Sequence, residues 1–333
     1  MSDVEAGGTP VDGSADAAWP RRYRVTHRTG YTYGMSVSDA YSVACLLPRT
    51  RPTQHVVERE LVIDPEPNEY DDRRDVFGNH VTQVGVHRPH DSFSITSTSI
   101  VEIDRPVAPS SALTWEEVAT TAATLTGPAA IAVGPYRALT AATTPERRRD
   151  LLDELAGRTF TSGRRLVDAI ADLTHTIFTE WVFDPTATDW ATPLDTVLEQ
   201  RRGVCQDFAH LAIAAIRSVG LPASYVSGYI ETDPPSGEEK SIGADASHAW
   251  CSVWVPDAST TGSDTADSEV PESAVPQLHW FDLDPTNDQF PPHRHVTVAW
   301  GRDYADVAPL RGVVIGPSAQ QRLDVSVDVH RLT

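Results

Sequence analysis

The sequence predicts an α+β protein in which an antiparallel β module comes first and a core with a helix packed on strands follows. Alternating apolar and polar residues dominate residues 21–105, which is typical of half-buried antiparallel strands. Later, apolar residues recur at helical spacing from Cys205 onward and predict a helix that begins there. Segments near 223–230, 248–255 and 279–284 are expected as the strands on which this helix packs.

The N-terminal module is predicted to begin near Tyr23. Residues 1–20 are small, acidic and aperiodic, so we expect a disordered tail there. The alternation is clearest in residues 56–63 and 94–103, and Pro-Glu-Pro and Phe-Gly-Asn mark turns between strands. We therefore expect residues 21–105 to form a β-rich domain.

A linker and the core follow this module. Residues 106–164 are rich in Ala, Thr and Pro with a patchy helical pattern, and we expect a linker or helical segment there. The core is expected over 165–333, and its first helix is predicted over 166–178. Residues 257–277 form an acidic, Ser/Thr-rich insertion that is longer than a hairpin needs. We expect a disordered loop there, with a substrate lid as the alternative.

The helix that begins at Cys205 has clear start and stop signals. Gly220-Leu221-Pro222 predicts its end, which places Cys205 in the first turn. Unpaired amides and the positive end of the helix dipole favour an anion at this position. The same amides could stabilise an oxyanion. The apolar face is made of Phe208, Leu211, Ala212, Ala215, Ile216 and Val219.

Cys205, His248 and Asp284 together have the residue types of a thiol acyl-transfer site. The reactive species of cysteine is the thiolate, and a free thiol with a pKa of roughly 8.5 is largely protonated at neutral pH. A nearby His248 could hold the thiolate as an ion pair and later protonate a leaving amine. Asp284, bonded to the far nitrogen of His248, would fix its tautomer and stabilise its charged form. Spacing along the chain does not by itself bring the three residues together.

Buried cysteines usually behave as small hydrophobic residues, and this structural interpretation suits two of the three cysteines. Cys45 follows an alanine and precedes two leucines, and Cys251 follows a tryptophan. Cys205 differs, because Gln206 and Asp207 are polar where core packing favours Val or Leu. Cys205 is therefore the candidate nucleophile.

The motifs around these residues resemble those of the transglutaminase-like superfamily, in its microbial branch of cysteine proteases and amidases. The resemblance implies a papain-like or transglutaminase-like core in which the helix with the nucleophile packs on an antiparallel sheet. It also implies that Cys205 is the nucleophile, His248 the base and Asp284 the orienting acid. The matching segments are Gly-Val-Cys-Gln-Asp-Phe-Ala-His (203–210), 220–229, Ser-His-Ala-Trp (247–250), Asp-Pro-Thr-Asn (284–287), 299–313 and the β-rich region 23–103.

Other polar residues have structural interpretations. His210 lies off the face of the thiol, so we expect it to order hydrogen bonds, and we expect Asp207 to be a structural carboxylate. His293-Arg294-His295 lies beside prolines and is interpreted as a surface loop in preference to a zinc site. No Cys-x-x-Cys, His-Glu-x-x-His or calcium-loop pattern occurs, so no metal or cofactor is expected. Trp181 and Trp190 are candidates for a second oxyanion donor.

Composition narrows the classes of partner. A chain of 333 residues with 40% hydrophobic residues can form two modules with a sizeable core. A formal charge of −20 argues against nucleic acid, whose phosphates would be repelled. The N-terminus has neither a basic start nor an apolar run, and no long apolar stretch occurs, which argues against secretion and membrane insertion. Three cysteines do not make a disulfide framework, and a cytoplasmic location is expected.

Three hypotheses of function follow. The first is a hydrolase that cleaves a peptide, protein or isopeptide amide through a thioester acyl-enzyme. The second is acyl transfer to an amine, as in a protein-glutamine gamma-glutamyltransferase. Water exclusion at the site decides between these two, and the sequence barely separates them. The third is a non-catalytic binding module of the same fold, which we rank last because Cys205, His248 and Asp284 are all present.

Overall fold

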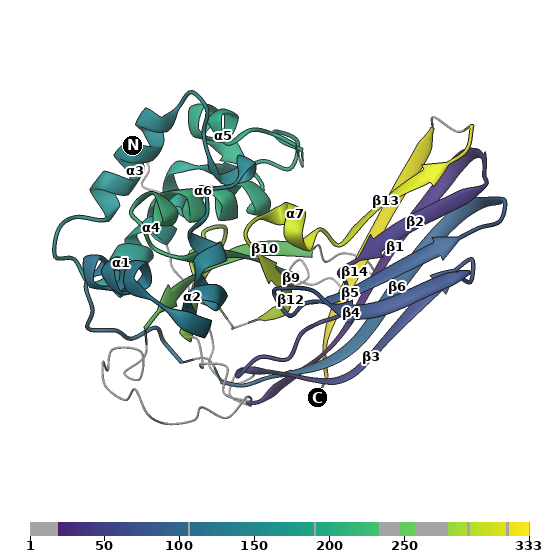
Figure 1. The fold of residues 1–333 in the computed structure, drawn as a ribbon, viewed down its shortest axis with the longest axis horizontal. Helices are drawn as coiled ribbons and strands as arrows, with labels where there is room; N and C mark the ends of the chain where they lie inside the picture. Colours follow the sequence, from purple (N-terminus) through teal and green to yellow (C-terminus); the bar gives the residue numbers. More distant parts are fainter. Residues whose placement is uncertain are drawn as a thin grey trace, which may run out of the picture.

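Two β-sheets form one half of the molecule, and a third sheet covered by helices forms the other half (Figure 1). This computed structural model describes residues 19–105, 107–189, 191–232, 247–256, 279–291, 294–317 and 320–332. The architecture is the predicted mixed α+β class with antiparallel sheets. Residues 1–18 of the predicted tail and the predicted insertion 257–277 lie outside the described residues.

The first half is built from two four-stranded antiparallel sheets, with strand orders β14-β1-β6-β3 and β13-β2-β5-β4. An apolar cluster with members from strands of both sheets lies at their interface, which makes the pair a sandwich. Side chains along β1 alternate between buried and exposed, as the sequence pattern predicts. The strands are β1 (Arg21–Val37), β2 (Asp39–Ala44), β3 (Gln54–Asp64), β4 (Glu69–Arg74), β5 (His80–Val86), β6 (His90–Ile103), β13 (Leu310–Ile315) and β14 (Gln321–Leu332).

The last two strands return to this sandwich, which differs from the expectation that the core extends over 165–333. β13 pairs with β2, and β14 pairs with β1 from Arg22↔Leu332 to Tyr33↔Gln321. A strand's alternation shows which residues face a core but not which sheet it joins. The partner is set by contacts some three hundred residues away, which local sequence does not encode.

Helices cover the core sheet, and their positions agree with the helical patterns in the sequence. The predicted helix 166–178 lies within α4, and the segment 106–164 contains α1, α2 and α3. Among the described residues, no helix combines the length and apolar character needed to cross a membrane. The helices are α1 (Trp115–Thr124), α2 (Gly127–Val133), α3 (Arg149–Thr159), α4 (Leu166–Glu180), α5 (Leu194–Gln200), α6 (Cys205–Ser218), α7 (Tyr304–Val307) and two short 3-10 turns at Gly134–Arg137 and Ala141–Thr143.

The core sheet is antiparallel with strand order β11-β10-β9-β12. Three of its strands are those predicted, namely β9 (Ala223–Ile230), β10 (Ser247–Val255) and β11 (His279–Leu283). The fourth, β12 (His295–Gly301), was not predicted. A short parallel pair, β7 (Val182–Phe183) and β8 (Arg202–Gly203), lies just before α6.

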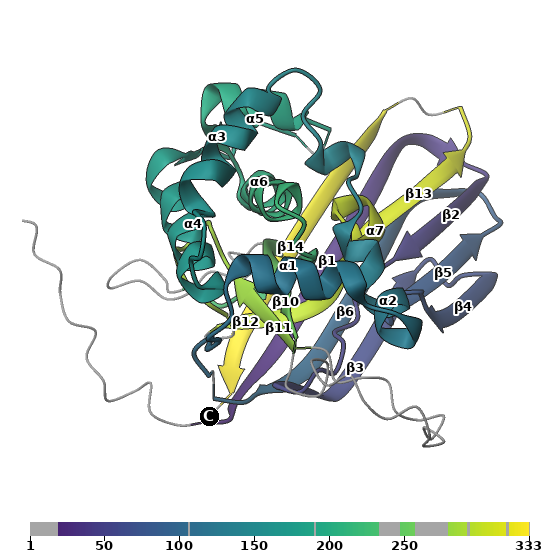
Figure 2. The ribbon, with the colours of Figure 1, turned by 60° about the vertical axis from the view of Figure 1, so that its left-hand side comes forward.

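Helix α6 lies at the centre of the core. Residues 207–217 are all buried, because α3, α4 and α5 pack around the helix (Figure 2) and β9 and β10 pack against it. A helix buried on every side is fixed in position by packing. Its first residue is Cys205, so the surrounding core holds that residue in place.

Candidate active site

The start of α6 is fixed by Asp207. Its Oδ2 accepts hydrogen bonds from the backbone N–H of Val204 at 2.8 Å and from Oγ1 of Thr188 at 2.6 Å. A Cβ on Gly203 would come within 2.6 Å of the same oxygen, so this close approach requires glycine. Burial raises the pKa of Asp207. The expectation of a structural carboxylate agrees with these contacts.

Cys205 is the first residue of α6 and is partly exposed, whereas Cys45 and Cys251 are buried. Burial raises the pKa of Cys45 to about 12 and that of Cys251 well above the usual thiol range. A thiol that stays protonated is a poor nucleophile. Cys205 is therefore the cysteine whose surroundings suit chemistry.

His248 contacts both of the other predicted site residues. It lies on β10, is 8% exposed, and its Nε2 is 2.8 Å from Oδ2 of Asp284. Cys205 is a further hydrogen-bonding partner of the imidazole, and Nδ2 of Asn287 lies 3.3 Å from the same Nε2. Burial acts to lower the pKa of His248, but the bonds to Asp284 and Cys205 outweigh burial and hold the pKa well above the usual histidine value. The structure thus brings Cys205, His248 and Asp284 together.

Asp284 is held in a tight turn and has no exposed surface. Its Oδ1 accepts the backbone N–H of Thr286 at 2.9 Å. Its Oδ2 lies 2.8 Å from His248 Nε2, 2.9 Å from His295 Nε2 and 2.7 Å from Asn287 Nδ2. Burial acts to raise the pKa of this carboxyl, but the bonds to the two histidines keep the pKa far below its usual value. The buried acid therefore stays ionised.

His295 is the site residue that the sequence analysis misplaced. It was expected on a surface loop, but it opens β12, is 1% exposed and bonds Asp284. The prolines before it suggested a loop, while the run Val296-Thr297-Val298 that follows is a strand signal. That run could have placed His295 at the start of a strand. His293 lies outside the described residues.

Trp250 packs against both imidazoles. Its ring stacks on His248 with centroids 5.9 Å apart and meets His295 edge-on at 5.0 Å. Room for the indole depends on Gly228, where a Cβ would come within 2.6 Å of Trp250 Cη2 and 2.1 Å of the Val296 carbonyl oxygen. Trp250 and Gly228 thereby help to fix where the two histidines lie.

The remaining candidates have partners of their own. His210 is buried and its Nε2 accepts the backbone N–H of Tyr304 at 3.2 Å, which agrees with the expected ordering role. Asp282 lies on β11, two residues before Asp284, and its carboxylate accepts hydrogen bonds from Arg51 and Ser252. The indole N–H of Trp181 donates to the Val197 carbonyl at 3.1 Å. Because this N–H already has an acceptor, Trp181 is not an oxyanion donor. Trp190 lies outside the described residues.

By residue type, His248, Asp284 and His295 could also hold a divalent transition metal. Their ligand atoms lie within 4.8 Å of one another and all three residues are buried. Their separations of 2.8 and 2.9 Å are ordinary for charge-assisted hydrogen bonds. The Asp284 carboxylate therefore has hydrogen-bonding partners without an ion, whereas Nδ1 of His295 has no partner among the described residues.

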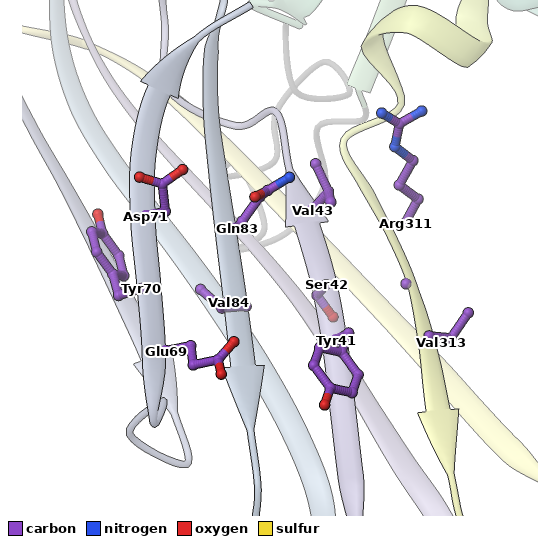
Figure 3. Close-up of a pocket in the computed structure, with 11 residues that line it drawn as sticks. Tyr41, Ser42, Val43, Glu69, Tyr70, Asp71, Gln83, Val84, Arg311 and Val313 are labelled. Carbon is purple, nitrogen blue, oxygen red and sulfur yellow. The ribbon is translucent and has the colours of Figure 1, made fainter.

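A separate hollow of about 630 Å³ lies on the outer face of the β13-β2-β5-β4 sheet (Figure 3). Tyr41, Val43 and Val313 give it an apolar floor, with Asp71 and Arg311 on opposite sides. Its lining residues come from β2, β4, β5 and β13 and include none of the site residues above.

Comparison with known proteins agrees with this architecture. Residues 23–102 match the bacterial transglutaminase-like N-terminal region, and residues 153–285 match the transglutaminase-like superfamily. The chain belongs to the transglutaminase-like superfamily. The superfamily match ends one residue after Asp284, so it includes Cys205 and His248 but not His295.

The chain is also similar to proteins of mycobacteria and to one solved structure. An uncharacterized protein of Mycobacterium tuberculosis (strain ATCC 25618 / H37Rv) is 40% identical over 313 residues, which cover 92% of each chain. An uncharacterized protein of Mycobacterium leprae (strain TN) is 30% identical, covering 93% of this chain and 99% of its own. The structure described as "a Putative Cysteine Protease from Cytophaga hutchinsonii" has a TM-score of 0.67 at 18% identity and covers 95% of this chain and 92% of its own. At that identity the likeness concerns the fold alone.

Proposed function

We propose that this protein is a cysteine-dependent hydrolase that cleaves amide bonds in peptides or proteins. The observation that carries the proposal is the position of His248, which has Cys205 as one hydrogen-bonding partner and Asp284 at 2.8 Å as the other. This order of thiol, imidazole and carboxylate can generate and use a nucleophile. Superfamily membership supports it.

In the acylation step, the Cys205 sulfur attacks the substrate carbonyl carbon and forms a C–S bond. The negative charge that develops on the carbonyl oxygen lies at the start of α6, where backbone amides and the helix dipole favour an anion. His248 donates its proton to the amine nitrogen as the C–N bond breaks. Asp284 stabilises the charged imidazole before that transfer and fixes its orientation.

In the deacylation step, a water molecule replaces the amine. Neutral His248 takes a proton from the water as the oxygen attacks the thioester carbon. The C–S bond then breaks, the acid product leaves, and the thiolate and imidazolium form again. Each turnover therefore consumes one water and needs no co-reactant.

Intact-mass spectrometry after incubation with a peptide library would test this function. We expect a mass increase on the wild-type chain that maps to Cys205 and decays as free acid appears. Cys205→Ala is the control and should show neither. An adduct that survives in Cys205→Ala, or complete absence of product from every peptide, would contradict the proposal.

Acyl transfer to an amine is the second candidate, because superfamily membership covers both outcomes of the same acyl-enzyme. It differs only in which nucleophile attacks the thioester. Hydrolysis is favoured because Cys205 is partly exposed, so water can reach the thioester.

A further inference from the structure

We infer that His295 is a positioning residue that holds the Asp284 carboxylate in the orientation His248 requires. This inference rests on the proposed function, since it assigns a fourth residue to the same site. Its basis is that one oxygen, Oδ2 of Asp284, contacts His248 at 2.8 Å and His295 at 2.9 Å.

The direction of the bond between His295 and Asp284 is fixed by chemistry. An ionised carboxylate can only accept hydrogen bonds, so Nε2 of His295 must carry a proton and donate it. Burial holds the pKa of His295 below its usual value, against the opposing effect of Asp284. His295 is therefore a neutral donor, while His248 on the other side of the same oxygen is the charged partner.

The two ring nitrogens of His295 differ in their surroundings, since Nε2 bonds Asp284 and Nδ1 does not. Among the residues that the structure describes, Nδ1 of His295 has no hydrogen-bonding partner although it is buried. Leaving a buried polar atom unsatisfied costs free energy, and an apolar residue would avoid that cost. Within the part of the chain that the structure describes, the polar contact of the ring that offsets it is the bond to Asp284.

The backbone places the two imidazoles on neighbouring parts of one sheet. His248 lies on β10 and His295 on β12, and both strands pair with β9 between them. Trp250 touches both rings, which keeps them on the same side of the sheet. The carboxylate of Asp284, which follows β11, reaches across to both histidines.

Without His295, the carboxylate would lose one of the donors that stop it from rotating. Asn287 would still bind Oδ2, and Thr286 would still bind Oδ1, but both lie in the same turn as Asp284. Besides His248 itself, His295 is the described donor that connects the carboxylate to the sheet. We therefore expect its loss to loosen the bond between Asp284 and His248 without unfolding the site.

Two amide substitutions of His295 separate positioning from packing. The side-chain nitrogen of glutamine can take the place of Nε2, whereas that of asparagine is too short to reach Asp284. Both variants are polar and smaller than histidine, and the melting temperature of each would be measured first. If His295→Asn lowers the melting temperature more than His295→Gln does, the later measurements are made well below the melting temperatures of both variants.

The main measurement is the rate at which iodoacetamide alkylates Cys205, followed by peptide mapping from pH 5 to pH 9.5. For His295→Asn we expect the rate at pH 6 to fall roughly ten- to a hundredfold, the range expected for losing a hydrogen bond to a charged group. At pH 9.5 the rate should match wild type, because a thiol ionises there without help from an imidazolium. His295→Gln should stay within about threefold of wild type at every pH.

The titratable groups around His295 are His248, Asp284 and Asp282.

Proton NMR of the ¹⁵N-histidine-labelled protein gives a second readout that does not depend on reactivity. We expect the downfield N–H signal of His248 bonded to Asp284 to persist in His295→Gln and to shift or broaden in His295→Asn. Wild-type rates and an unchanged His248 signal in His295→Asn would overturn the inference, as would equal losses in both variants. If Cys205 of the wild type reacts no faster than Cys45 and Cys251, the proposed function fails instead, and the NMR comparison still decides the role of His295.

Discussion

Arg51 of the N-terminal module donates to Asp282 of the core at 2.7 Å, two residues before Asp284. Both side chains are largely buried, and the same Nη1 also bonds Oγ1 of Thr297 on β12 at 2.9 Å. The β module therefore contacts both the strand that leads to Asp284 and the strand that begins at His295. This relationship makes the module part of the support for the site.

Arg51→Met should destabilise the protein, because it leaves Asp282 buried without its charged partner. Removing one member of a buried ion pair costs about 3–5 kcal/mol. The double variant Arg51→Met/Asp282→Asn should be less destabilised than the single one, since no uncompensated charge remains. Urea unfolding of the wild type, the two single variants and the double variant measures the free energy of unfolding of each. Strict additivity of the two substitutions would show that the pair does not couple.

Cys205 should be the most reactive thiol. It is partly exposed and bonded to His248, whereas Cys45 and Cys251 are buried and their raised pKa values keep them protonated. Iodoacetamide at pH 6 with peptide mapping should label Cys205 first. Equal labelling of the three cysteines would refute this. Cys205→Ala should leave the melting temperature within a few degrees and abolish turnover.

Asp284→Asn should preserve the fold and lower turnover by roughly three to four orders of magnitude. Asparagine has the same shape but carries no charge to stabilise the imidazolium of His248. Asp282→Asn is the matched comparison two residues earlier, on β11, and it should reduce stability more than it reduces the turnover of folded enzyme, because Asp282 bonds Arg51. Turnover of Asp284→Asn near the wild-type rate would remove Asp284 from the mechanism.

Acid should weaken the fold below about pH 6.5. Burial lowers the pKa of His27 and of His210 to about 4. Between pH 6.5 and 4 these two histidines bind protons in the unfolded chain but not in the folded chain, so their contribution to stability is fully present above pH 6.5 and is lost as the pH falls. Each histidine should contribute roughly 2 kcal/mol of loss at pH 5.

The control for this acid effect is His27→Gln. It keeps a polar group near its two hydroxyl partners, Tyr229 and Thr29, but cannot titrate. Melting temperatures from pH 7 to pH 5 should fall less steeply in this variant than in the wild type. Parallel curves would mean that His27 does not titrate in this window.

The sequence predicted the parts of the site that are local and missed the parts that depend on distant pairing. The helix that begins at Cys205 is encoded by its own apolar spacing, and it is observed as α6. The strands that carry His248 and lead to Asp284 were also predicted. The meeting of these residues was only an inference from chemistry and resemblance, because three elements must pack before the side chains can touch.

His295 shows the opposite case. Local signals around it conflict, since prolines precede it and a strand run follows, and its partner Asp284 is bound only once β12 has paired with β9. The return of β14 to β1 likewise depends on contacts between opposite ends of the chain. Neither relationship could be read from residue type or spacing alone.

The last prediction separates hydrolysis from transfer, which share the same acyl-enzyme. An amine can compete with water only where water is kept from the thioester, and Cys205 is partly exposed beside the polar Gln206. A glutamine or amide substrate supplied with millimolar primary amine should therefore yield mainly free acid by mass spectrometry. Deleting residues 259–275 serves as a test of the insertion, since a passive loop leaves rate and product ratio unchanged and a lid changes them. Predominance of the amine adduct at low amine concentration would move the protein to the transferases.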